Sequence, residues 1–460
     1  MSKPIFYIFL CVLVGCGKGE KKSQNAFFAG EIVNPSSEYV VLFKGDVALD
    51  SAKLDGQNRF SFTMDSISEG LYHFNHEPEL QYVYLEKGDS LMIRLNTLYF
   101  DESLIFSGKG EEINNFLLDL FLANEEEASL IRTLYRLNAV DFVDKIDSLK
   151  QIRLDALTEL NKESALSEKK EKIGRASVEY NYNTYKEEYA FKHLKFTGEN
   201  VFDKLPENFY NYRSDLTFND KDLTYLRPYY QFMNNHMGNL SYMTCKHDCA
   251  IKKGMVRNPL HFNMHKLQLI DSLVQEKDLR DNLFRYVAFN YLLNVNDAEE
   301  NNEKFIESFH KLSDNNRHMQ EIDALYEGIK NIQPHKEIPD VAVYDLDGNT
   351  ISLRDIAGKK KTVFYFWSGS NRNHFEHIKR RVAKLTAENP ENRFVGINIR
   401  TPETVWKGLL ETSDLDQHMQ YRATDFDALT KSLVIDRLNK CIITEDGRIV
   451  NAFADVYKPL

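Results

Sequence analysis

The stretch KTVFYFWSGSNRNHFEHIKRR, which occupies residues 361–381, decides the fold of the C-terminal part of this 460-residue chain. It begins with a continuous apolar run, residues 362–367, whose length and aromatic composition are typical of a buried strand. A short polar segment follows, and apolar residues at helical spacing then begin at Phe375. The sequence therefore predicts a core strand, a turn and a helix in direct succession.

The neighbouring segments extend this unit to a mixed sheet. Upstream, the turn Asp347-Gly348-Asn349 separates two short apolar segments and predicts a hairpin. Downstream, we expect a helix at 375–389, a strand at 393–399, a helix near 405–412, a further segment including 429–434, and a closing hairpin at 440–444 and 448–453. This order predicts a central sheet covered by helices on both faces.

The order and spacing of these segments resemble the TlpA-like branch of the thioredoxin fold over residues 334–460. The resemblance rests on Pro339, Asp347-Gly348, Ser352-Leu353, Gly358-Lys359, 363–367, 394–398 and 442–450. It implies a Cys-x-x-Cys pair at the start of the helix, where the helix dipole lowers the pKa of a thiol. Here the two positions hold Asn371 and His374, and no cysteine occurs between Cys249 and Cys441.

Two further positions depart from the family pattern. The place of the family's cis-proline is held by Leu438. A cis bond before a residue other than proline costs ~2.5–4 kcal/mol, so we expect a trans bond there. Residues 451–460 are too few for the C-terminal helix of the fold. The resemblance therefore predicts a redox-inactive thioredoxin-like domain.

Another chemistry could in principle use the same place. His374 could act as a general base, with Ser368 or Ser370 as the nucleophile, but no carboxylate partner is visible within the motif. We interpret residues 371–374 as N-capping residues and a solvated first helical turn. Cys441 replaces an apolar strand residue and is expected to be an inert core thiol.

The N-terminal residues MSKPIFYIFLCVLVGCGKGEKK have the features of a secretory signal. The apolar run 5–14 is too short to span the ~30 Å hydrocarbon core of a bilayer. It ends in Leu13-Val14-Gly15-Cys16, which resembles the bacterial lipobox and implies cleavage before Cys16 and lipidation of that residue. An ordinary signal peptide with a chance cysteine is the alternative.

These features predict a signal peptide at 1–15, a tether at 16–25 and a lipid-anchored protein of the cell envelope. Gly17 after the cysteine resembles lipoproteins sorted to the outer membrane. Whether the protein faces the periplasm or the cell surface stays open.

Residues 26–110 have the pattern of a small antiparallel β-domain, sandwich-like or barrel-like. Residues 59–64 alternate with period two, and turn signals such as Asp55-Gly56 and Lys87-Gly88-Asp89 recur at short intervals. The order of motifs from Phe28 to Gly110 resembles the β-domain of unknown function that precedes thioredoxin domains in envelope lipoproteins of Bacteroidota.

Residues 111–333 are rich in charged and apolar mixtures typical of paired helices. Aromatic residues are dense there, as in Phe209-Tyr210-Asn211-Tyr212. Buried helix packing is the interpretation we prefer. The alternative is an open groove that would make the region a peptide or glycan receptor.

The segment Thr244-Cys245-Lys246-His247-Asp248-Cys249 is the remaining cysteine signal. In an oxidising compartment the pair favours a local disulfide. A zinc site is the alternative, although it needs about four ligands and would draw on His236, His261 or His265. The third alternative is that these two cysteines are a catalytic pair, which lies here instead of at the family's Cys-x-x-Cys position.

The sequence thus predicts a multidomain α+β envelope lipoprotein with a binding or scaffolding role and no metal or cofactor. A net charge of −11 and the lack of a long basic tract argue against nucleic acid, which leaves the membrane and an envelope protein as partners. The chain is not expected to be an enzyme. The rival hypothesis is a thiol–disulfide oxidoreductase of the TlpA-like family that uses Cys245 and Cys249.

Overall fold

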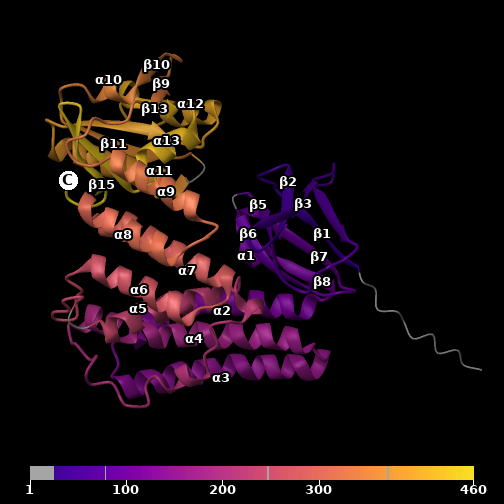
Figure 1. The fold of residues 1–460 in the computed structure, drawn as a ribbon. Coiled ribbons are helices and arrows are strands. Elements are labelled where there is room, and N and C mark those ends of the chain that lie inside the picture. The colour runs from indigo at the N-terminus through magenta and orange to yellow at the C-terminus, as the bar shows by residue number, and fades with distance from the viewer. Residues whose placement is uncertain (1–24, 78, 246–247, 370–371) are drawn as a thin grey trace, which may run out of the picture. The chain divides into compact units, whose positions relative to one another are not determined.

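The computed structural model describes residues 25–77, 79–245, 248–369 and 372–460, and the chain divides into two compact units. The first unit extends to Lys186 and includes Tyr225–Tyr229, and the second comprises Glu187–Thr224 and Tyr230–Leu460. The division falls inside helix α4 (Glu168–Thr197). Helices and sheets occur in both units, which confirms the mixed α+β class (Figure 1).

The first unit begins with two four-stranded sheets that share one apolar core. One has the order β4-β1-β7-β8 and the other β3-β2-β5-β6. Their strands are β1 (Ala26–Val33), β2 (Tyr39–Lys44), β3 (Val47–Lys53), β4 (Arg59–Met64), β5 (Gly70–His76), β6 (Glu79–Leu85), β7 (Ser90–Asn96) and β8 (Ile105–Lys109). Phe28 of one sheet meets Phe74 of the other, with ring centroids 5.5 Å apart. Strand β4 buries Phe60 and Phe62 and exposes the residues on either side of each, as the period-two alternation of its sequence predicts.

The prediction of a purely antiparallel β-domain is wrong at one pairing. Strands β1 and β7 are parallel neighbours, with Phe28 opposite Leu91. Parallel neighbours need a long crossover, and the chain supplies one by building the second sheet between them. No local pattern in the sequence distinguishes this arrangement from a simple meander.

Helix α2 (Glu111–Leu134) joins the edges of both sheets through two adjacent asparagines. Asn114 accepts a hydrogen bond from the Tyr84 N–H (2.7 Å) and donates to the Tyr84 carbonyl (2.9 Å) at the β6 edge. Asn115 makes the equivalent pair with Phe106 at the β8 edge (3.1 and 3.0 Å). These amides satisfy strand groups that would otherwise lack partners at the two sheet edges.

The other helices of the first unit are α1 (Phe100–Ser103), α3 (Ala139–Ser164) and the first part of α4, with a 3-10 turn at Thr97–Tyr99. The aromatic rings of α4 are packed inside, as Tyr182 is fully buried and its hydroxyl donates to Glu127 (2.7 Å). Among the described residues, no helix combines the length and apolar composition needed to cross a membrane.

The second unit contains the last part of α4 and, from Tyr230 onward, helix α5 (Arg227–Thr244). Helices α6 (Pro259–Leu273), α7 (Lys277–Asn290), α8 (Glu299–Leu312) and α9 (Met319–Asn331) follow, with short helical turns at Asn211–Asp215, Lys221–Leu223 and Tyr291–Val295. Phe209 and Phe232 are buried, so these aromatic side chains form helix packing rather than the walls of an open groove.

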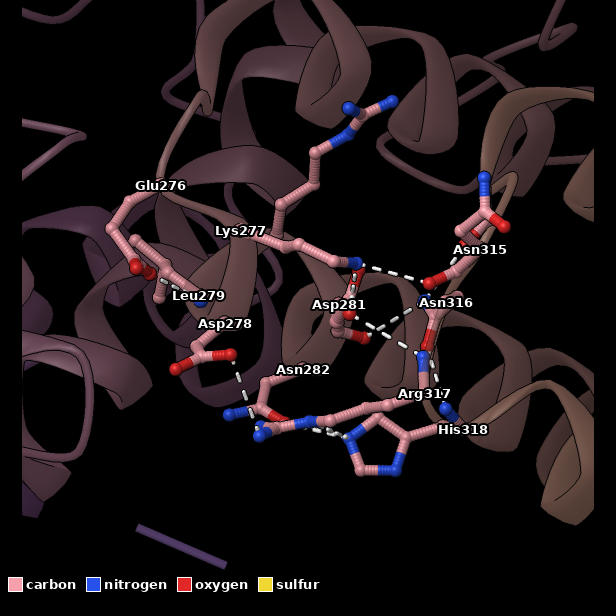
Figure 2. A network of polar contacts seen from close by, with 12 residues as sticks. Glu276, Lys277, Asp278, Leu279, Asp281, Asn282, Asn315, Asn316, Arg317 and His318 are labelled. Atoms are coloured by element: carbon pink, nitrogen blue, oxygen red, sulfur yellow. Dashed lines mark hydrogen bonds and ion pairs between the residues drawn. The ribbon is translucent and has the colours of Figure 1, made fainter.

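The loop between α8 and α9 is fixed to the first turns of α7 by a polar network (Figure 2). Asp281 accepts from Lys277 (2.9 Å) and from the Arg317 N–H (3.4 Å). Asn282 lies 2.8 Å from both the Arg317 guanidinium and the His318 ring. The network sets the start of α9, whose Gly328 then lies close to Val434 in the C-terminal part of the unit.

That C-terminal part is a seven-stranded sheet with the order β10-β9-β13-β12-β11-β14-β15. Its strands are β9 (Ala342–Tyr344), β10 (Thr350–Ser352), β11 (Thr362–Trp367), β12 (Arg393–Asn398), β13 (Gln420–Ala423), β14 (Lys440–Glu445) and β15 (Arg448–Asp455). The helices are α10 (Leu353–Ala357), α11 (Arg372–Glu388), α12 (Glu403–Glu411) and α13 (Phe426–Leu433), and a 3-10 turn lies at Gln417–Met419. Strand β11 pairs in parallel with β12 and antiparallel with β14. This confirms the central mixed sheet that the sequence predicts.

The last residues form no helix after β15, as the sequence predicts. Instead, Arg381 of α11 holds the chain end, with Nε donating to the Val456 carbonyl (2.8 Å) and Nη2 donating to the Lys458 carbonyl (2.9 Å). Arg381 thus bonds the tail to α11, while Val456 is buried in the core and Leu460 packs against it.

The asparagine pair of α2 gives a stability prediction. We expect Asn114→Ala to lower the free energy of unfolding of the first unit by about 2 kcal/mol, because buried backbone groups of Tyr84 lose their partner. Asn115→Ala, at a half-buried position, is the matched comparison and should cost less. Urea denaturation followed by circular dichroism measures both. An unchanged stability of Asn114→Ala would contradict this role.

Candidate functional site

The candidate site lies where three parallel strands, β11, β12 and β13, present their carboxyl ends at one edge of the sheet. Ligand sites of open α/β sheets commonly lie at such an edge. Strand β11 ends there with Trp367, which is fully buried. Its Nε1 donates to the Gln420 Oε1 (3.2 Å), and Gln420 in turn donates to the Tyr365 hydroxyl (2.9 Å). The indole is thereby fixed beneath the site.

The turn after Trp367 is packed against the neighbouring segments. The Gly369 N–H donates to the Thr401 hydroxyl (2.7 Å). A Cβ atom at Gly369 would lie 2.7 Å from both the Leu409 side chain and the Thr401 methyl group. Ser368 is buried. The described part of the turn is therefore closely packed against Thr401 and Leu409.

His374 takes a structural place in the first turn of α11. Its Nε2 lies 3.3 Å from the Phe366 carbonyl, and its ring is half-buried. Burial lowers the pKa of His374, and the nearby His377 lowers it further. Because its Nε2 is engaged with a strand carbonyl, His374 is a poor candidate for a general base with Ser368. Ser370 and Asn371, the other residues considered at this place, lie outside the described residues.

At the position of the family's cis-proline, the chain forms a turn that a buried lysine stabilises. Leu438 is half-buried in the turn that precedes β14. Two residues later, Lys440 is buried and its Nζ donates to the carbonyls of Leu433 (2.9 Å) and Val434 (2.6 Å) at the end of α13. Burial lowers the pKa of Lys440 to about 7. A lysine and the last carbonyls of a helix thus organise this corner.

Cys441 offers no accessible thiolate. It is fully buried on β14, opposite Tyr365 of β11. Burial raises the pKa of the Cys441 thiol to about 12. A thiol in this state is neither a nucleophile nor a metal ligand at neutral pH.

Cys245 and Cys249 are joined by a disulfide just after α5. Cys245 is 6% exposed and Cys249 is 0% exposed. Of the histidines considered as partners for this pair, only His261 lies close to both sulfur positions. His265 Nδ1 is 3.0 Å from the Ser241 hydroxyl, and His236 belongs to another cluster. His247 lies outside the described residues.

The cluster that contains His236 is centred on Glu187, and sequence reasoning did not find it. Glu187 is completely buried and accepts hydrogen bonds from Arg213 Nε (2.9 Å), His236 Nδ1 (2.8 Å) and Asn239 Nδ2 (2.7 Å). The His236 ring stacks on Phe232, with centroids 5.5 Å apart. Burial would raise the pKa of Glu187, but the bonds from His236 and Arg213 outweigh it and lower the pKa to about 2.

This cluster is suited to holding segments together rather than to catalysis. Arg213, His236 and Asn239 each bond to the Glu187 carboxylate, which has no contact with solvent. The network links α4, the turn at Asn211–Asp215 and α5. The only hint in the sequence is the density of aromatic residues around these positions.

Comparison with known proteins gives matches in structure alone. No model of a protein family matches the chain, and no curated protein matches it. Several solved structures are similar to it. A thiol:disulfide interchange protein from Bacteroides sp. matches at 21% identity and TM-score 0.23, over 26% of this chain and 80% of its own. The thioredoxin domain of a thiol-disulfide oxidoreductase from Bacteroides vulgatus matches at 20% identity and TM-score 0.21, over 26% and 86%.

A thioredoxin-like protein from Bacteroides caccae is similar over a longer part, 59% of this chain and 89% of its own, at 10% identity and TM-score 0.32. At these identities and TM-scores the likenesses carry no argument about activity.

The Glu187 cluster gives a pH-dependent prediction. The pKa of Glu187 is about 2 in the folded chain and 4.5 in its ordinary state, so its contribution is complete above pH 4.5 and is lost as the pH falls toward 2. We expect Glu187→Gln to reduce the stability of the second unit by about 3 kcal/mol at neutral pH, and the difference from wild type to shrink below pH 4.5.

Tryptophan fluorescence during denaturation measures this effect, because Trp367 and Trp406 are the two tryptophans of the chain and both lie in the second unit. Glu300→Gln, on the exposed surface of α8, is the control and should leave stability unchanged. A difference that stays constant from pH 7 to pH 3 would exclude the proposed electrostatic role.

Proposed function

We propose that this chain is a lipid-anchored protein of the cell envelope in which a thioredoxin-like domain serves binding or scaffolding rather than dithiol chemistry. The proposal rests on which residues occupy the junction between β11 and α11 and on how they pack. The family's first helical turn would present two thiols, whereas this chain has no cysteine there. The turn is instead packed through Gly369 and Thr401, and His374 is bonded to the β11 backbone.

The other cysteines of the described chain support the same conclusion. Thiol–disulfide exchange requires a thiolate that can approach a partner sulfur, or a disulfide that a thiolate can reach. Cys441 is buried with a raised pKa, and the Cys245–Cys249 disulfide has one sulfur-bearing residue wholly covered. Neither is presented to a protein substrate.

The rival function is a thiol–disulfide oxidoreductase that uses Cys245 and Cys249 as a relocated pair. Catalytic disulfides have at least one sulfur exposed to the attacking thiolate. The low exposure of both residues favours a structural disulfide instead. We therefore keep the oxidoreductase as the second candidate.

The anchoring part of the proposal rests on the sequence around Cys16, which lies outside the described residues. Several acyl chains on this residue would hold the protein on a membrane, because each buried CH2 contributes ~0.8 kcal/mol. The outer membrane is the proposed site, and an envelope protein is the proposed partner.

The redox part can be tested by insulin reduction. We expect the purified chain to reduce insulin with dithiothreitol at the uncatalysed rate, and Cys245→Ser and Cys249→Ser to change nothing. Cys441→Ser serves as a control for a buried thiol. Activity that either Cys245→Ser or Cys249→Ser abolishes, with Cys441→Ser still active, would establish the rival function.

The anchor can be tested in cells. Globomycin should make the unprocessed precursor accumulate, and Cys16→Ser should release the protein from the membrane fraction. Cys11→Ser, within the signal, is the matched control and should be processed normally. A size that stays the same with globomycin would exclude a lipoprotein precursor.

A further inference from the structure

The segment that carries the Cys245–Cys249 disulfide has a second chemical capability. We propose that, when this disulfide is reduced, the two sulfurs bind Zn²⁺ together with His261, and that Asp248 completes the coordination. The proposal is independent of the binding role and of the lipid anchor.

The ligand atoms are already close together. The sulfur atoms of Cys245 and Cys249 and a ring nitrogen of His261 all lie within 4.8 Å of one another. Zn–S bonds of ~2.3 Å and Zn–N bonds of ~2.0 Å place tetrahedral ligand atoms roughly 3.5 Å apart. Opening the S–S bond therefore brings the three atoms close to the required separation with small side-chain movements.

Asp248 is the nearest candidate for the fourth position. Its Oδ2 lies 3.7 Å from His261 Nε2, and its side chain is 76% exposed, so it can turn toward the same ion. Carboxylate oxygens are accepted zinc ligands. His265, one helical turn after His261, is already bonded to Ser241 through Nδ1.

Backbone and side-chain hydrogen bonds, in addition to the disulfide, organise the chain around these residues. The Cys249 carbonyl accepts from the N–H groups of Arg257 (3.3 Å) and Asn258 (3.2 Å). The Asn258 side chain donates to the Asp248 carbonyl (3.1 Å) and accepts from the His261 N–H (3.1 Å), where it caps α6. One asparagine thus fixes three of the proposed ligands relative to one another.

The spacing agrees with this geometry. Cys245 and Cys249 are four residues apart, and His261 follows Cys249 after eleven intervening residues. Zinc sites commonly combine Cys-x2–4-Cys with a histidine that follows at about this distance. His261 also lines a solvent-open groove of 550 Å³ beside Met264 and Gln268, which gives an ion a route to the site.

An external dithiol breaks the S–S bond by giving two electrons and two protons to Cys245 and Cys249, and is itself oxidised to a disulfide. A phosphine does so by taking oxygen from water and becoming the phosphine oxide, while the water supplies the two protons. Zn²⁺ then displaces both protons, and the two thiolates neutralise its charge. The oxidised chain has no thiolate, so it does not bind the ion there.

The test uses the full chain reduced with a phosphine, desalted under argon and titrated with Zn²⁺ against a chromophoric chelator. We expect one equivalent to bind to the reduced chain and none to the oxidised chain. His261→Ala should weaken binding at least 10-fold, Cys249→Ser should abolish it, and Asp248→Asn should weaken it. His310→Ala, an exposed histidine on α8, is the control and should bind as wild type.

His261→Ala keeps the disulfide, so its fold can be verified in the oxidised state by circular dichroism if Cys249→Ser does not fold. Thiolate-to-metal charge-transfer absorption with Co²⁺ in place of Zn²⁺ is a second readout. Equal zinc affinity of the reduced and oxidised chains would overturn the proposal. Equal affinity of His261→Ala and His310→Ala would overturn it as well.

Discussion

The complete burial of strand β11 is the constraint on which the C-terminal part of the protein depends. All six of its residues are inaccessible to solvent, with β12 on one side and β14 on the other. A strand covered on both faces must be apolar along its whole length, and this requirement fixes which strands flank it and where helices pack. The only sulfur beside the strand in the described pairing is that of Cys441 on β14, which packs as an apolar group, and no dithiol is involved. The fold can therefore persist where the dithiol of related sequences is absent.

Features set by neighbouring residues could be predicted from the sequence. The apolar run of β11 and the Asp-Gly turns located the central strand and both hairpins. Strand β13 was missed, because its four residues, Gln420 to Ala423, do not form an apolar run. Gln420 is buried all the same, since it bonds Trp367 and Tyr365, which are 53 and 55 residues away. A hydrogen-bond partner so far away in the sequence cannot be inferred from the residues that neighbour Gln420.

The Glu187 cluster was missed for the same physical reason. In the sequence, Glu187 is one more acidic residue of a segment that is rich in Lys and Glu. In the structure, its carboxylate is the centre of a buried network. The partners Arg213, His236 and Asn239 are 26, 49 and 52 residues away. By contrast, the cysteine pair of the candidate zinc site is separated by four residues, and this short spacing made it visible from the start.

The packing around Gly369 bears on what a Cys-x-x-Cys pair would meet if it were installed in this chain. Two mutations to cysteine would supply the thiols of the motif. They would not move the Thr401 and Leu409 side chains that pack against the turn, nor exchange the Lys440-supported corner for one built on proline. Installing the dithiol would therefore change two side chains and leave the packing on both sides of them as it is.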